Sequence, residues 1–327
     1  MQRYVGVFLV AATAFARQYD CKVESLTRDA VSGESRVPAG RDDLGHTMKA
    51  ILVPTEHGAG MQSALDTALS LARTFGSCIQ GFALRPAVAD LVAMDPDSGL
   101  TMVAVKENDA EMARNAEDFF RAFMSQNGVP ARHDDAAPAS LSFAWLSDAP
   151  SGHDFVGSYG RVFDIIVLAR PGDEWQSPAM VTLESALFES GRPVMIAPPA
   201  SPASLGTNVL IAWNGSTEQA RSMGDAMPLL RRAERLTICT VEGATVAGPS
   251  GEEMARTLKM NGIAAEPITL KPNKRTAGEV LLAKAEELGC DLIVKGAYTQ
   301  SRLRQMIFGG TTRHVLAHAK LPVLMAH

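Results

Sequence analysis

The sequence has few of the features that mark secreted, metal-binding or nucleic-acid-binding proteins. Only four cysteines occur in 327 residues, and no two of them form a C-x-x-C pair. Because disulfide frameworks and zinc sites need clustered thiols, we interpret Cys21, Cys78, Cys239 and Cys290 as isolated residues of a protein in a reducing compartment. The formal net charge of −5 argues against binding to nucleic acid or to an anionic membrane. We therefore expect a cytoplasmic protein with neither kind of partner.

Several catalytic motifs are also missing. The sequence contains no G-x-S-x-G elbow, no G-x-x-x-x-G-K-[ST] loop and no G-x-G-x-x-G turn, so it lacks three common signatures of hydrolases and nucleotide enzymes. His314 and His318 stand one helical turn apart, but the sequence suggests no third ligand, and we interpret them as surface residues. We predict that the protein is not an enzyme and has no metal site.

The first 47 residues differ in character from the rest. A basic start and the apolar run Tyr4–Ala16 resemble a signal peptide, but the run is too short to span a bilayer. Residues 18–47 are polar and show no period, whereas Met48 directly precedes a strongly predicted strand. We predict that residues 1–47 are a disordered extension, or that Met48 is the true start, and that the segment is dispensable for folding.

The remainder reads as two similar series of strands and helices, and the length suits two domains. Short runs rich in Val, Ile and Leu, without polar alternation, are typical of parallel strands that are buried on both faces. These runs are residues 50–54, 164–168 and 193–196 in the first series, and residues 208–212, 291–295 and 322–325 in the second. Their alternation with helical patterns predicts an α/β fold with right-handed crossovers.

Helices are predicted from apolar positions spaced at i, i+3, i+4 and i+7. The predicted helices are residues 63–75, 111–124, 276–288 and 311–319, and glycines stand at expected helix ends, namely Gly76, Gly128, Gly191, Gly262 and Gly289. Ile51 to Asp164 spans 113 positions whereas Val209 to Asp291 spans 82. We place much of this excess at residues 86–101, and we interpret residues 198–206 as the linker between the series.

The stretch from Gly296 to Thr312 connects a buried strand to a predicted helix, beyond the carboxyl end of the strand. Ligands bind at this place in α/β sheets. Glycines there let backbone N–H groups approach a phosphate, and the helix N-terminus adds a favourable dipole. The hydroxyl groups of Thr311 and Thr312 can donate further hydrogen bonds, while Lys295 and Arg302 offer positive charge nearby. The stretch therefore predicts a site for phosphate.

This stretch resembles the signature of the universal stress protein family, in which G-x-x-G is followed by nine residues and then by Gly-Ser or Gly-Thr. Gly296 and Gly309 match the first and third glycines. Thr299 replaces the second glycine, and Gly310 holds the position of the hydroxyl residue, with Thr311 one place later. Together with the duplication, the motif extends the resemblance over about residues 48–327.

The resemblance implies two tandem domains, each a five-stranded parallel sheet of the Rossmann-like, adenine nucleotide alpha hydrolase-like type, packed as a pseudo-dimer through their last strands. Residues 48–198 would be a diverged repeat without a phosphate loop, and residues 207–327 a repeat with a partial nucleotide-binding motif. The function implied is a stress-response binding or regulatory protein. The tandem chain could in addition form a homodimer.

In nucleotide-binding members of the family, an Asp after the first strand contacts the adenine, and Asn214 matches its position. An amide still forms hydrogen bonds with a base. The cofactor implied is ATP or another adenine nucleotide, with or without Mg²⁺, and its affinity should be weakened by Thr299 and Gly310. The candidate binding residues are Asn214, Gly215, Ser216, Gly296, Ala297, Thr299, Gly309, Gly310, Thr311 and Thr312.

The first repeat offers nothing comparable. Glu56 stands at the position of Asn214, and Asp173 and Glu174 follow the strand where phosphate would bind, so we expect no nucleotide in this repeat. Two alternative functions remain open for the chain. It could be an interaction module that binds no nucleotide, if the changes at Thr299 and Gly310 abolish binding, or an ATP-hydrolysing enzyme of the same fold group.

Overall fold

The computed structural model describes residues 48–56, 58, 60–87, 102–132, 140–171, 178–297 and 310–327. The predicted extension at residues 1–47 and most of the predicted insertion at residues 86–101 lie outside this part of the chain. No helix among the described residues is both long and apolar enough to cross a membrane.

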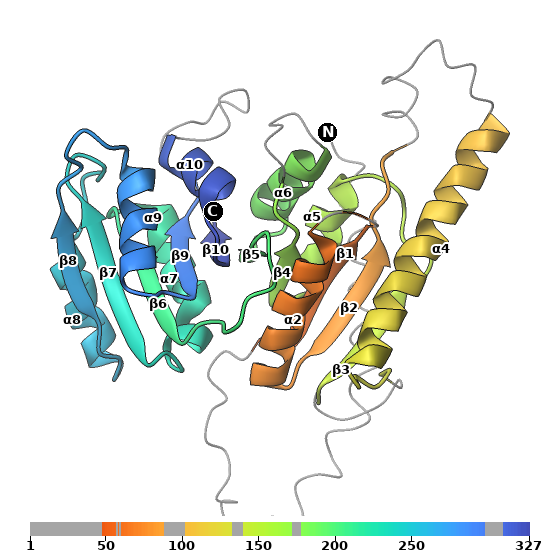
Figure 1. Ribbon diagram of the computed structural model, residues 1–327, viewed down its shortest axis with the longest axis horizontal. Helices are drawn as coiled ribbons and strands as arrows, with labels where there is room; N and C mark the ends of the chain where they lie inside the picture. The colour runs from red at the N-terminus through yellow and green to blue at the C-terminus, as the bar shows by residue number, and fades with distance from the viewer. Residues whose placement is uncertain are drawn as a thin grey trace, which may run out of the picture. The chain divides into compact units, whose positions relative to one another are not determined.

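Strands and helices alternate through both repeats (Figure 1). The elements of the first repeat are β1 (Ala50–Thr55), α2 (Met61–Phe75), β2 (Cys78–Ala83), α4 (Met102–Gln126), β3 (Ser142–Leu146), α5 (Asp154–Gly160), β4 (Ile165–Leu168), α6 (Pro178–Glu189) and β5 (Val194–Ile196). The elements of the second are β6 (Asn208–Ala212), α7 (Thr217–Leu230), β7 (Arg235–Val241), α8 (Gly251–Met260), β8 (Glu266–Leu270), α9 (Ala277–Glu287), β9 (Leu292–Gly296), α10 (Gly310–His318) and β10 (Val323–Ala326).

The ten strands form one sheet in the order β3-β2-β1-β4-β5-β10-β9-β6-β7-β8. Each half therefore has the same order, in which the first strand lies between the second and the fourth. All neighbouring strands are parallel except β5 and β10, which pair antiparallel through Val194 with Met325 and Ile196 with Val323. The tandem α/β fold with five strands in each repeat is confirmed, and the two repeats join through their last strands as expected.

Two aspartates show that the repeats are built alike. The carboxylate of Asp164 accepts hydrogen bonds from the backbone N–H groups of Lys49 and Ala50, at 2.7 and 2.8 Å. Asp291 does the same for Thr207 and Asn208, at 3.1 and 2.9 Å. Each aspartate precedes the fourth strand of its repeat and fixes the start of the first strand beside it. The two positions are therefore structurally equivalent.

Both faces of the sheet are covered by apolar side chains, as continuous strand hydrophobicity predicts. One core cluster contains residues of α2, α4, α7 and α8, and the other contains residues of α5, α6, α9 and α10. The strands β1, β4, β6, β9 and β10 are buried over almost their whole length. Each cluster runs through both repeats, so the two halves share their cores.

The five glycines predicted to end helices all adopt left-handed backbone conformations, with φ between 61° and 76°. One helix boundary differs from the prediction. Helix α4 begins at Met102, not near Glu111, and its 25 residues exceed the 10 of α8, so part of the extra length of the first repeat lies in this helix. Its first turn, residues 102–105, is a continuous apolar run, and the next turns are rich in charged residues such as Asp109, which forms an ion pair with Arg85. That composition hid the helical period from sequence analysis.

Candidate functional site

The ends of β6 and β9 lie side by side at the carboxyl edge of the second half of the sheet. β6 and β9 are neighbours, with Ile211 opposite Val294, while β7 lies beyond β6 and β10 lies beyond β9. The chain thus leaves these two strands in opposite directions, which is the topological switch point where open α/β sheets bind ligands. The turn Trp213–Ser216 follows β6, and Gly296 ends β9. The structure therefore brings the predicted base residue and the first signature glycine to adjacent strand ends.

Asn214 shapes the turn after β6. Its Oδ1 accepts a 3.2 Å hydrogen bond from the backbone N–H of Ser216, and the hydroxyl of Ser216 accepts one of 3.2 Å from Gln219 at the start of α7. Gly215 between them has a φ of 80°, which a glycine adopts without strain. The side-chain Nδ2 of Asn214 has no hydrogen-bond partner among the described residues. The half-buried amide therefore keeps two N–H donors for a ligand.

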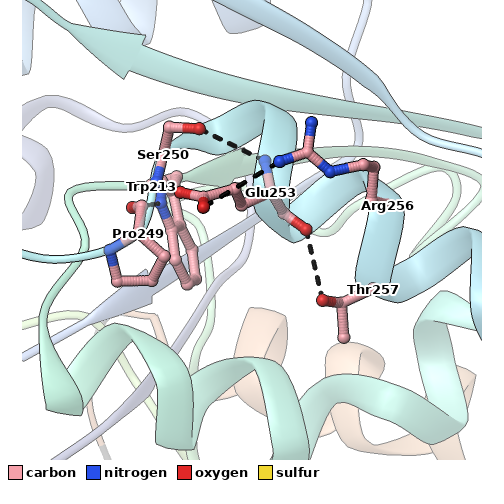
Figure 2. Close-up of polar contacts among 6 residues, drawn as sticks. All are labelled: Trp213, Pro249, Ser250, Glu253, Arg256 and Thr257. Carbon is pink, nitrogen blue, oxygen red and sulfur yellow. Dashed lines mark hydrogen bonds and ion pairs between the residues drawn. The ribbon is translucent and has the colours of Figure 1, made fainter.

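The loop that follows β7 is anchored beside this turn (Figure 2). The indole Nε1 of Trp213 donates a 2.9 Å hydrogen bond to the carbonyl of Pro249. Ser250 and Glu253 form a reciprocal cap at the start of α8, with bonds of 2.7 and 3.2 Å. A Cβ on Gly248 would lie 2.3 Å from the carbonyl oxygen of Gly215, so the two loops touch through their backbones. The turn after β6 and the loop after β7 are therefore held together on one side of the switch point.

Gly296 is needed for packing between strand and helix. A Cβ at this position would lie 2.5 Å from the backbone nitrogen of Gln219, in the first turn of α7. The backbone N–H of Gly296 donates a 2.6 Å hydrogen bond to the side-chain Oε1 of Gln219, which is only 1 % exposed. The absence of a side chain at Gly296 thus brings α7 against β9. This close approach is a structural reason for the glycine that sequence analysis missed.

Ser222, one turn further along α7, continues this polar contact. Its hydroxyl lies 3.1 Å from the carbonyl of Lys295 and accepts a 3.1 Å hydrogen bond from the backbone N–H of Ala326. Gln219 and Ser222 therefore bind the backbone ends of β9 and β10. The sequence signal was available, because both are polar residues at i and i+3 on a helix face whose neighbours, such as Met223, are buried.

The first turn of α10 stands where phosphate binding was predicted. Gly310 is exposed and a Cβ there would meet no atom of the described residues within 4 Å, while Thr311 is half-buried. Thr312 differs from expectation, because it is only 4 % exposed and its hydroxyl accepts a hydrogen bond from Lys295. Ala297 is buried and its backbone N–H bonds to β10. Thr299 and Gly309, with Arg302, lie outside the described residues.

Lys295 places a buried cation beside this helix terminus. The side chain is 8 % exposed, and its Nζ donates hydrogen bonds of 2.8 Å to the carbonyl of Gly296 and 2.8 Å to Thr312. Both acceptors are neutral. Burial lowers the pKa of the Lys295 ammonium to about 8, because desolvation disfavours the charged form. Charge and helix dipole therefore both favour an anion here.

The corresponding corner of the first repeat has the opposite character. Glu56 follows β1 at the position of Asn214, and burial raises the pKa of its carboxyl. Leu168 occupies the place of Lys295 when Asp164 is aligned with Asp291. Asp173 and Glu174 lie outside the described residues. The described part of this corner thus lacks both the amide and the cation of the second repeat.

A separate cavity of about 600 Å³ lies near the amino ends of β9 and β10. It is lined by residues of the linker, of α9 and of α10, and the α10 residues include His314 and His318. The rings of these two histidines stack with centroids 4.3 Å apart, and the pKa of His314 is lowered by burial and by His318. Among the described residues, no group of three His, Cys, Asp or Glu side chains is arranged to hold a metal ion.

The strand order defines a tandem α/β protein whose second repeat has a topological switch point, the place where open α/β sheets bind ligands. A universal stress protein from Archaeoglobus fulgidus DSM 4304 shares this fold, with a TM-score of 0.66 and 16 % identity, over 86 % of this chain and 96 % of its own. A putative universal stress protein from Pseudomonas aeruginosa UCBPP-PA14 aligns over 85 % and 93 % of the two chains, with 15 % identity and a TM-score of 0.49.

Residues 207–327 match the sequence model of the universal stress protein family. A search of curated proteins gave no match. The second repeat is therefore similar to the universal stress protein family, as the resemblance of the signature stretch predicted.

Proposed function

We propose that the second repeat binds an adenine nucleotide, and that the chain acts as a stress-response binding or regulatory protein. In this proposal the base lies against the turn at Asn214, and the phosphates lie toward Gly296 and the start of α10. The observation that carries the proposal is the position of Asn214, in the turn after β6, because β6 lies next to β9, the strand that leads into the signature stretch.

The state of the Asn214 amide supports adenine as the base. Its Oδ1 is oriented by Ser216, and this contact fixes the direction in which Nδ2 points. An amide that offers both N–H and C=O pairs well with adenine, which presents N7 as an acceptor and the N6 amino group as a donor. Replacement of the family's Asp by Asn therefore changes the hydrogen bonds to adenine without removing them.

Charge around α10 supports an anionic group on the ligand. Backbone N–H groups of a first helical turn lack intrahelical acceptors, and the helix dipole is positive at that end. Lys295 adds a cation whose described partners are neutral oxygens. Nucleotide phosphates would satisfy both. The missing hydroxyl at Gly310 and the engaged hydroxyl of Thr312 leave fewer side-chain donors, so we propose weak binding.

The proposal extends to the setting of the protein. We propose that it works in the cytoplasm, binds nucleotide without turning it over, and has neither nucleic acid nor membrane as a partner. Because β5 and β10 already pair with each other, a homodimer of this chain would have to use another surface.

Isothermal titration of the full chain with ATP, with and without Mg²⁺, tests the proposal. Asn214→Ala should weaken binding by roughly ten-fold, the effect of losing about 1.4 kcal/mol of hydrogen bonding. Asn214→Asp keeps an acceptor for Ser216 and for the N6 amino group, and should bind ATP. The matched control is Asn261→Ala, at the exposed end of α8. Absence of ATP binding by the wild type would overturn the proposal and favour the interaction-module function.

A further inference from the structure

Arg170 of the first repeat reaches across to the last helix of the second. Its Nη1 donates hydrogen bonds to the carbonyls of Val315 and Leu316, at 3.2 and 2.6 Å. Its Nη2 donates one of 3.3 Å to the carbonyl of Leu321, in the segment that enters β10. Arg170 follows β4, so one side chain joins a strand end of the first repeat to the C-terminal half of α10.

The chemistry of this contact suits both partners. The last four carbonyls of a helix lack intrahelical donors, and the dipole is negative at this end, so a cation is favourable there. Burial lowers the pKa of Arg170 to about 10, and the group stays charged at neutral pH. A planar guanidinium can hold three carbonyls at once, which a single ammonium head does less well.

Helix α10 has only nine residues, and its first turn is the proposed phosphate contact. At about 1.5 Å per residue, Gly310 lies within roughly 10 Å of the carbonyls that Arg170 holds. The other end of the helix is tied to β9 by the bond between Thr312 and Lys295. Loss of the contact with Arg170 or of the contact with Lys295 would let this short helix shift, and the backbone N–H groups of its first turn would shift with it.

Arg170 has no charged counterpart at the equivalent position of the second repeat. When Asp164 is aligned with Asp291, the residue equivalent to Arg170 is Ala297, which is buried and has no charged group. Ala297 therefore cannot hold the carbonyls of α6 as Arg170 holds those of α10. Arg170 therefore gives the first repeat a structural effect on the second, although the first repeat has the acidic residue Glu56 where a nucleotide base would bind.

We propose that Arg170 is a positioning residue through which the first repeat sets the place of α10, and thereby the nucleotide affinity of the second repeat. This inference rests on the proposed function. It assigns to the diverged repeat support for a site that it does not itself contain.

The test uses the full chain with Arg170→Met, which keeps an unbranched apolar stem but removes the guanidinium with its charge and donors. ATP affinity should fall between about two-fold and thirty-fold, the range for residues that act on a site through others. Amide hydrogen exchange within α10 should speed up, because the helix loses its tie. The control is Arg192→Met, an exposed arginine of the same repeat that donates two hydrogen bonds to the carbonyl of Arg161. It should change neither readout.

Arg170→Lys keeps the charge and should restore part of the affinity and of the exchange protection. If Arg170→Met fails to fold, the lysine variant carries the comparison against wild type. Unchanged exchange in α10 and unchanged ATP affinity in the Arg170 variants would overturn the inference while leaving the proposed function intact. If the wild type binds no ATP, the proposed function and the claimed effect on affinity both fail, and the exchange data still decide whether Arg170 holds the helix.

Discussion

The ammonium of Lys295 lies 2.8 Å from the hydroxyl of Thr312, so a buried cation joins the end of β9 to the first turn of α10. The other described partner of this ammonium is the carbonyl of Gly296, at 2.8 Å. Neither partner is charged. Burial of a cation against neutral oxygens lowers its pKa, and this makes the contribution of Lys295 to stability depend on pH.

We expect the wild type to gain stability relative to Lys295→Met as pH rises from about 8 toward 10.5. In that window the unfolded chain still holds the Lys295 proton while the folded chain has lost it, so a rise in pH favours folding. The gain is at most about 1.4 kcal/mol per pH unit. Urea unfolding at several pH values measures it. The same measurement on the exposed control Lys259→Met serves for comparison. If the difference in free energy of unfolding between the wild type and Lys295→Met did not change with pH, the low pKa of Lys295 would be contradicted.

Two glycines of the signature stretch should respond differently to alanine. Gly296→Ala places a Cβ 2.5 Å from the backbone of Gln219, so α7 must move, at a cost of about 1–3 kcal/mol. Gly310→Ala adds a Cβ that meets no atom within 4 Å in the described part of the chain, and it should leave stability unchanged or raise it by up to about 1 kcal/mol. Denaturant unfolding of both variants checks this. Equal losses would mean that α7 does not approach β9 as described.

The chain should bind one ATP, not two. Glu56 stands where the second repeat has Asn214, and its half-buried carboxyl, whose pKa is raised by burial, offers no N–H donor to a base and repels phosphate when it is ionised. Leu168 replaces the cation Lys295. Calorimetric stoichiometry of the full chain measures the number of sites. A value near two, with two similar affinities, would show that the first repeat also binds nucleotide.

Restoring the family signature should tighten binding. The double substitution Thr299→Gly with Gly310→Ser returns a hydroxyl donor to the start of α10, and each hydrogen bond to a charged group contributes about 1.5–3 kcal/mol. We expect roughly ten-fold or stronger ATP binding, measured at constant salt and magnesium. An unchanged dissociation constant would indicate that phosphate lies elsewhere.

Sequence analysis predicted the fold well because its strongest signals are local. Strands such as β6 are continuous apolar runs, and the glycines at helix ends require a left-handed backbone, so both features can be read from a few adjacent residues. The predicted start of α4 was wrong because its first turn, residues 102–105, is a continuous apolar run, and the charged stretch that follows shows no clear apolar period.

The candidate site was only partly predictable, because its contacts join distant residues. The place of Asn214 follows from strand order, and the motif gave Gly296. Gln219 and Ser222 indicate a polar contact on one face of α7, but the partner Gly296 could not be inferred from the sequence because it lies 77 positions from Gln219. The same holds for Arg170, whose acceptors lie 145 to 151 positions further along the chain.

ATP titration of the wild type beside Gly310→Asp and Gly224→Asp tests the central claim most directly. A Cβ at Gly310 would meet no atom of the described residues within 4 Å, and a carboxylate suits a helix N-terminus, where it stabilises by about 0.3–1 kcal/mol, so we expect Gly310→Asp to fold. Gly224, exposed in the middle of α7, receives the same charge away from the site and also has open space. We predict saturable binding by the wild type and Gly224→Asp, and affinity at least roughly ten-fold lower in Gly310→Asp, because the carboxylate repels phosphate. Equal binding by all three proteins, or none by the wild type, would contradict a nucleotide site at the start of α10.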